Sequence, residues 1–310
     1  MRPGLATGWG MSAKTKRTVG FVAWLRQRQS LQGILLVGPT AIWLLLFLGV
    51  PLVVVVLYSF WVREPGGGVE QTFTLENYAH FLNRGVYGRI LLRSFRVGLE
   101  TAILALILAY PTAYYLARRP SGSTILILLL LVPFWTSFLI RLFAWMLILM
   151  ERGVANSVLL GLGIIDEPLR LLFTPLAVVI GLIYSALPFA ILPIYAVLRG
   201  IDSELVPAAK MLGANDLQAF VEVTLPLSMP GIMTALIITF ISGAGSFLAP
   251  AILGGKGADL MSNVIANRFL ESFDWPFGSA LAIILLVSML LFLMIVNKYV
   301  ALEDIYGPSK

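Results

Sequence analysis

The chain consists of long apolar segments separated by short polar ones. Six stretches carry no charged residue, and a helix needs about 20 residues to cross roughly 30 Å of hydrocarbon. The stretches are apolar on every side, unlike the alternating strands of a membrane barrel. The pattern therefore predicts an all-α integral membrane protein with six transmembrane helices. The uncharged stretches cover residues 29–62, 101–117, 120–140, 171–198, 223–255 and 275–297, with the second extended back to about residue 97 and the third on to about residue 149.

Five spans remain the alternative, because the second stretch is the shortest and its extension contains Glu100. Composition supports a membrane protein: 59% of the 310 residues are apolar and 12% are charged, where soluble domains have roughly 45–50% and about 25%. The chain has no cysteine and one histidine, His80. This excludes thiolate chemistry and histidine-pair metal sites, so we expect no catalytic residue, metal site or cofactor in this chain.

Basic residues predict the orientation. Six lysines and arginines precede residue 29, and cytoplasmic segments carry the excess of positive charge. With an even number of spans, both termini are predicted to be cytoplasmic. The net charge of +6 does not predict a nucleic-acid partner, because the basic residues are dispersed between the apolar blocks.

One long internal loop, residues 199–230, is the place to look for a protein partner. The segments Asp202–Gly213 and Leu217–Val223 predict two short helices. Gly213 suits the position just past a helix end, and Asp216 is predicted to cap the second helix. Pro226 is predicted to end it.

The spacing in this loop resembles that of a known family. The loop has Ala208-Ala209, three intervening residues, Gly213, nine further residues and then Val223-Thr224-Leu225-Pro226. This pattern resembles the Glu-Ala-Ala loop of ABC importer permeases. Pro207 stands where the family usually has Glu, and Val223 where it has Ile. The resemblance implies a type I ABC importer permease fold and a loop that docks on an ATPase through these residues: Pro207, Ala208, Ala209, Gly213, Val223, Leu225 and Pro226.

A second set of motifs resembles the spermidine/putrescine-type permeases. It consists of residues 133–141 (PFWTSFLIR), Ala144-Trp145 and residues 110–114 (YPTAY). The resemblance implies an ATP-driven importer of polyamines in a bacterial inner membrane. Its implied partners are an ATP-binding ATPase dimer, a second homologous permease subunit, with a homodimer as the alternative, and a periplasmic substrate-binding protein. ATP would be bound by the ATPase, not by this chain.

Combining spans, orientation and resemblance gives a domain division. The predicted parts are a basic cytoplasmic arm (1–32), a first transmembrane helix (33–62), a periplasmic loop (63–96), a core permease domain of five helices (97–300) containing the cytoplasmic coupling loop (199–230), and a cytoplasmic tail (301–310).

Several residues are candidates for the solute pathway. Arg141 is a charge within a span, and such a charge must face protein or water; Glu100 pairs with it or attracts a cation. Trp135, Trp145 and Tyr184 offer aromatic faces to an ammonium group, although interface belts also contain Trp and Tyr. Pro133, Pro188, Pro193 and Pro250, with Gly243 and Gly245, are expected to interrupt helices that line the pathway, or to produce kinks that serve packing alone.

Two other functions stay open at this level. Another small solute, such as an amino-acid derivative or a phosphonate, is the alternative substrate. A stand-alone secondary transporter is the alternative mechanism, although no internal repeat is evident. A membrane enzyme is disfavoured, because the spans contain no carboxylate cluster and the chain no Gly-x-Ser-x-Gly motif.

Overall fold

The computed structural model describes residues 29–64, 66, 68–119 and 123–299. Most of the predicted basic arm and all of the predicted C-terminal tail lie outside this range. The chain divides into two compact units, with the boundary after Leu57. Each unit is described by itself.

The first unit contains α2 (Gln29–Leu44), the π-helical turn η1 (Leu45–Gly49) and most of α3 (Val50–Ser59). Proline lacks an N–H and its ring crowds the carbonyl four residues earlier. The wide turn η1 ends two residues before Pro51, so it lies where that crowding acts. The helical stretch Val37–Ser59 is long and apolar enough to cross a membrane, as predicted for the first span.

The second unit is almost entirely helical and includes one small antiparallel pair of strands. Its elements in chain order are β1 (Val62–Arg63), β2 (Val69–Glu70), α4 (Glu76–Asn83), α5 (Gly85–Arg118), α6 (Ser123–Leu131), η2 (Val132–Trp135), α7 (Phe138–Leu149), α8 (Val154–Gly161), α9 (Pro175–Gly200), α10 (Leu205–Met211), α11 (Asp216–Ala219), η3 (Phe220–Thr224), α12 (Leu225–Ala244), α13 (Leu248–Leu253), α14 (Met261–Leu270) and α15 (Trp275–Tyr299).

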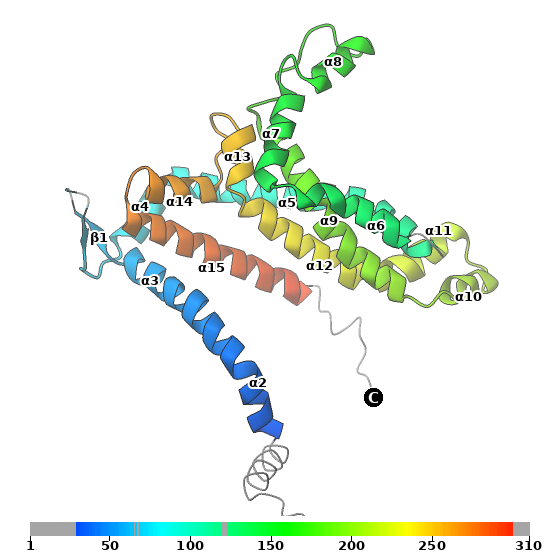
Figure 1. The fold of residues 1–310 in the computed structure, drawn as a ribbon, viewed down its shortest axis with the longest axis horizontal. Helices are drawn as coiled ribbons and strands as arrows, with labels where there is room; N and C mark the ends of the chain where they lie inside the picture. Colours follow the sequence, from blue (N-terminus) through cyan, green and yellow to red (C-terminus); the bar gives the residue numbers. More distant parts are fainter. Residues whose placement is uncertain (1–28, 65, 67, 120–122, 300–310) are drawn as a thin grey trace, which may run out of the picture. The chain divides into compact units, whose positions relative to one another are not determined.

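Three long helices, α5, α9 and α12, pack side by side in the centre of this unit (Figure 1). Small residues at their interfaces let the backbones approach closely, which is the usual basis of helix association in membranes. A Cβ added to Gly98 of α5 would lie 2.7 Å from the Ala244 Cβ of α12. A Cβ added to Gly231 of α12 would lie 2.9 Å from the Pro193 carbonyl of α9. The buried alanines of this core are Ala105, Ala109, Ala113, Ala186, Ala190 and Ala235.

Aromatic rings join α15 to these helices. Phe292 of α15 stacks on Phe240 of α12 with ring centroids 4.3 Å apart, and Phe95 of α5 meets both rings edge to face. The single histidine, His80 of α4, packs edge-on against Phe277 at 4.7 Å. His80 therefore contributes to packing near the start of α15.

A sharp bend separates two parts of the predicted third span. The helical stretches Thr124–Trp135 and Phe138–Gly161 meet at 87°, and α7 and α8 project away from the long helices (Figure 1). The predicted interruptions are confirmed at Pro133, in the 3₁₀ turn at the bend, and at Gly245, which ends α12. They are wrong at Pro188 and Pro193, which lie inside the continuous α9. Neighbouring helices in a membrane bundle tolerate such internal prolines.

The predicted number of six spans is not confirmed. By length and apolar composition, four helical stretches of the described chain could cross a bilayer, or five if the bent pair counts as one span. The predicted second span lies in α5, whose 34 residues include Pro111 and charges near both ends. The four stretches are Val37–Ser59, Pro175–Gly200, Asp216–Ala244 and Trp275–Val296.

Candidate functional site

The loop after α9 forms a short helix with a well-defined end. In α10 the N–H of Gly213 donates to the carbonyl of Lys210 at 3.0 Å, and that of Ala214 to the carbonyl of Ala209 at 3.1 Å. This pair of bonds is the Schellman motif, which requires a left-handed residue at the position of Gly213. Gly213 has a φ of +99°, a conformation that favours glycine. The predicted helix end at Gly213 is confirmed.

The second loop helix, α11, starts and ends differently from the prediction. Its N-cap is Asn215 rather than Asp216: the Asn215 side chain accepts from the N–H of Gln218, and the Gln218 side chain accepts from the N–H of Asn215. Asp216 instead forms an ion pair with Lys210 at 2.5 Å. The helix does not end at Pro226, because α11 continues through the π-helical turn η3 into α12. Pro226 lies directly after η3, in the first turn of α12, so the wide π turn stands where the proline ring would crowd an ordinary helix.

Four exposed residues form what we term the loop tip: Met211, Leu212, Gly213 and Leu217. The side chains of Met211, Leu212 and Leu217 are 84%, 91% and 71% exposed. Ala208 and Ala209, which the sequence placed on the contact face, are half-buried, whereas Pro207 is exposed. Val223 and Leu225 are half-buried and Pro226 is exposed. The exposed surface of this loop is therefore more apolar than the alanines alone suggested.

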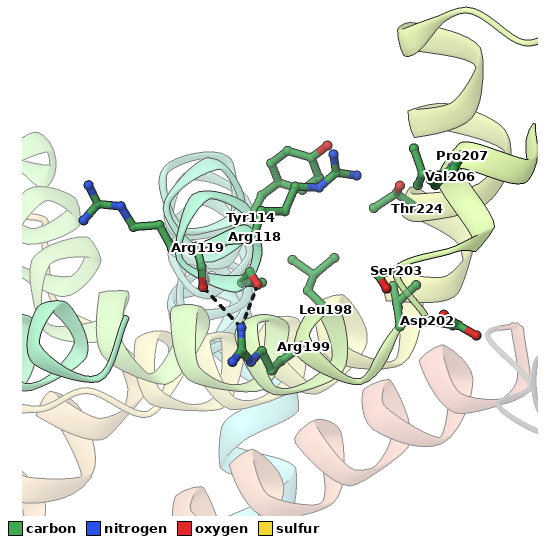
Figure 2. Close-up of a pocket in the computed structure, with 12 residues that line it drawn as sticks. Tyr114, Arg118, Arg119, Leu198, Arg199, Asp202, Ser203, Val206, Pro207 and Thr224 are labelled. Carbon is green, nitrogen blue, oxygen red and sulfur yellow. Dashed lines mark hydrogen bonds between the residues drawn. The ribbon is translucent and has the colours of Figure 1, made fainter. Parts of the chain in front are cut away.

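A pocket of about 480 Å³ lies where the loop meets the ends of α5 and α9. Figure 2 shows Tyr114 and Arg118 on one side of this pocket and Val206, Pro207 and Thr224 on the other. The guanidinium of Arg118 lies over the Tyr114 ring at 4.3 Å. Arg199 at the end of α9 donates to the carbonyls of Ala117 and Arg119, each at 3.3 Å. This cation neutralises the partial negative charge at the end of α5 and ties the two helix ends together.

A second cavity, of about 510 Å³, lies between α7, α9, α12 and α13. It combines aromatic rings, three serine hydroxyls and one charged group, Arg141, and none of its lining residues is acidic. Such a recess of apolar walls with a few polar groups is the usual form of a small-molecule site. The lining residues are Phe138, Arg141, Leu182, Ser185, Phe189, Ser242, Gly243, Ser246, Phe247 and Leu248.

The five predicted pathway residues do not all lie at the cavity. Arg141 lines the cavity. Tyr184 stacks on Phe134 at 5.7 Å and meets the edge of Trp145 at 5.7 Å, so these rings form a cluster beside Arg141. Trp135 is 84% exposed and does not line the cavity. Glu100 pairs with Arg96 of the same helix at 2.7 Å and not with Arg141.

Sequence reasoning missed several residues of both sites. Ser185, Ser242 and Ser246 come from separate elements, and no local pattern marks them. Apolar Met211 and Leu212 in a polar loop were a usable signal, because exposed apolar residues in a short loop commonly mark a contact surface.

Solved structures share this fold. The crystal structure of a bacterial ABC transporter involved in the import of the acidic polysaccharide alginate matches 91% of this chain and 98% of its own, with a TM-score of 0.69 and 20% sequence identity. A crystal structure of a bacterial alginate ABC transporter in complex with alginate pentasaccharide-bound periplasmic protein also matches this chain, with a TM-score of 0.68. The chain therefore shares its fold with a chain of these bacterial ABC transporters.

Residues 22–302 match the family of binding-protein-dependent transport system inner membrane components, and the chain belongs to this family. It is similar to the spermidine/putrescine transport system permease protein PotB of Escherichia coli K12, with 39% identity over 269 residues, 84% of this chain and 98% of that protein. The PotB protein of Haemophilus influenzae is 36% identical over 84% of this chain and 94% of its own length. The inner membrane ABC transporter permease protein YdcU of E. coli is 31% identical over 250 residues.

These relationships confirm both resemblances read from the sequence. The chain is a multi-pass inner-membrane permease subunit of an ABC importer.

Proposed function

We propose that this permease subunit carries putrescine and spermidine from the periplasm to the cytoplasm. The observation that carries the proposal is the similarity to a permease named for spermidine and putrescine. The two chains are 39% identical, and the match covers 98% of that permease. The ring cluster of Phe134, Tyr184 and Trp145 beside the cavity supports it, because aromatic faces attract ammonium groups.

We further propose that the loop tip docks on a soluble ATPase dimer. Its exposed Met211, Leu212 and Leu217 offer an apolar contact, and the left-handed Gly213 keeps the backbone accessible beside them. ATP is then bound and hydrolysed in that partner, and this chain acts as a membrane subunit without enzymatic activity. In this arrangement the loop faces the cytoplasm, as do both termini.

The complete importer in this proposal has two further components. A second homologous permease completes the pathway. A periplasmic binding protein delivers the solute and selects it. The lipid bilayer covers the apolar outer surface.

Titration calorimetry of the cognate binding protein, combined with uptake by the reconstituted importer, tests the substrate. We expect binding of putrescine or spermidine and ATP-dependent uptake of the same compound into liposomes. Liposomes with this chain alone should show no uptake. Uptake by the single chain would contradict the shared pathway and indicate a stand-alone transporter.

One observation favours a second substrate class, namely a small anion such as a phosphonate or an acidic amino-acid derivative. Arg141 places a positive charge on the cavity wall, and no lining residue is acidic. The same titration separates the two classes, because binding of an anion without a response to either polyamine would overturn the polyamine assignment and leave the importer function intact.

A further inference from the structure

Arg141 is a cation that no carboxylate accompanies in the described part of the chain. Its guanidinium Cζ lies 4.4 Å from the ring centroid of Phe134 and 5.9 Å from that of Phe138. Its Nη1 donates a hydrogen bond of 3.3 Å to the carbonyl of Pro133. Its Nε is buried and has no hydrogen-bond partner among the described residues. Two ring faces and one long hydrogen bond therefore hold this cation in place.

The bend between η2 and α7 does not depend on the Arg141 side chain. The carbonyl of Pro133 already accepts a shorter hydrogen bond of 2.7 Å from the Thr136 hydroxyl. The N–H of residue 141 bonds to the carbonyl of Ser137 at 3.2 Å, a contact that any residue with an N–H makes. A purely structural role for the guanidinium is thus a weak explanation for a charge within a span, where charges are costly.

The ring face under Arg141 is suited to an ammonium group. Phe134 presents one face to the guanidinium and stacks with Tyr184, whose ring meets Trp145. Aromatic faces attract any cation placed over them, and more strongly where water is excluded. Of the two rings under Arg141, Phe138 lines the cavity, so a solute ammonium in the cavity would reach these rings at the position that Arg141 occupies.

The serines that line the cavity offer acceptors for a displaced or second cation. The Ser185 hydroxyl donates to the Gly181 carbonyl at 2.9 Å, which leaves its lone pairs available. Ser242 and Ser246 line the same cavity, and its volume of about 510 Å³ leaves space for a long side chain to change rotamer.

We infer that Arg141 is an internal cation that occupies an ammonium site on the Phe134 and Phe138 rings, and that a solute ammonium group must displace it to pass. This inference rests on the proposed polyamine substrate. Arg141 then competes with the solute and repels it once displaced, so the site binds an amine weakly and briefly. A pathway needs such weak binding, because the solute must also leave.

The test measures equilibrium binding of radiolabelled spermidine to the assembly of both permeases and the ATPase dimer in lipid nanodiscs, without nucleotide or binding protein. Arg141→Gln removes the competing cation, and we expect the apparent Kd to fall by about tenfold, the effect of one desolvated cation–π contact made available to the solute. Arg141→Met, whose side chain retains an apolar stem, should give the same gain and provides a second variant if the glutamine protein fails to assemble. Arg141→Lys, which keeps the charge, should bind as the wild type does.

Two controls separate this effect from a change in overall charge or packing. Arg96→Gln removes one positive charge from an exposed pair on α5 and should leave the Kd unchanged. Adding Phe134→Leu to Arg141→Gln should abolish the gain, because the ring face is then lost. The gain should also be confined to amines, so 1,4-butanediol should compete no better against spermidine in the variant than in the wild type.

Unchanged or weaker spermidine binding in both Arg141→Gln and Arg141→Met would overturn the inference, as would an equal gain in Arg96→Gln. Tighter binding of an anion by the wild type, lost in the same variants, would instead make Arg141 a solute ligand. If the wild-type importer transports no polyamine at all, the substrate proposal fails. If it does, and the variants gain nothing, the internal-cation inference alone is wrong.

Discussion

The loop tip and the cavity around Arg141 differ in the side chains that they present and in how the structure holds them. The loop tip exposes apolar side chains from one short segment and fixes the backbone with local caps. The cavity conceals a charge between helices that are distant in the sequence, and it holds that charge with rings instead of a carboxylate. A surface of the first kind suits a permanent protein contact, and a recess of the second kind suits a passing solute. Substitutions in the two regions should therefore separate partner association from solute passage.

The largest effect should come from Gly213→Asp. A side chain at φ +99° is strained, and the new carboxylate would lie between the apolar residues of the loop tip. We expect uptake and co-purification of the ATPase to fall to background, although the protein remains in the membrane. Gly257→Asp is the matched control, because Gly257 has a φ of +89° and equally open surroundings but lies far from this loop. If Gly257→Asp lost the ATPase to the same extent, backbone strain rather than the loop contact would explain the effect.

Ser242→Trp should give the converse result in the cavity. Ser242 is exposed and lines the cavity, so a large ring can enter the space without disturbing the helix core. Uptake should be largely lost, whereas the amount of ATPase that co-purifies with the permease stays at the wild-type level. Loss of the ATPase in this variant would show that the two regions are not separable.

Leu212→Glu should weaken association by about tenfold, the loss expected when a charge replaces an apolar side chain near the centre of a contact. The variant chain should keep its thermal stability, because the Leu212 side chain is 91% exposed. Surface plasmon resonance with immobilised ATPase measures the difference. A comparable change at Leu270, which is also exposed but belongs to α14, should leave the affinity as it was.

The smallest effect should come from Lys210→Ala. The pair with Asp216 at 2.5 Å is exposed on both sides, and such pairs contribute at most about 1 kcal/mol. We expect less than about a fivefold change in ATPase affinity. The difference should disappear at high salt, because screening removes the attraction between exposed charges. A larger or salt-independent loss would show that Lys210 itself contacts the partner.

The loop was largely predictable because its determinants are neighbours in the chain. α10 ends at a Schellman motif in which Gly213 donates to Lys210 and Ala214 donates to Ala209, and the position of the glycine in the sequence reveals this end. The choice of Asn215 over Asp216 as N-cap was also readable, since Gln218 stands three residues after Asn215 and completes a capping box. The predicted pair of Glu100 with Arg141 was wrong, although Arg96, four residues before Glu100 on one helix face, was a readable alternative.

The cavity was not predictable in the same way. Arg141 was identified because a charge within an apolar span is conspicuous, but the groups around it depend on how α7, α9, α12 and α13 pack. Phe134 reaches Arg141 only because the chain bends by 87° after Trp135. Proline alone did not identify that bend: Pro133 accompanies one, whereas Pro188 and Pro193 leave α9 continuous.

The unbroken passage from α11 through η3 into α12 has a mechanical consequence. The helical stretch Asp216–Ala244 has 29 residues and is about 44 Å long at about 1.5 Å per residue. One end adjoins the loop tip, and Ser242 and Gly243 at the other end form part of the cavity wall. If an ATPase moves the loop tip as proposed, such a rod would act as a lever, because a tilt at the loop would displace the far wall of the cavity. Two features would soften this rod, namely the wide π turn η3 and Pro230 inside α12, and their stiffness would set how much of a tilt at the loop reaches the cavity wall.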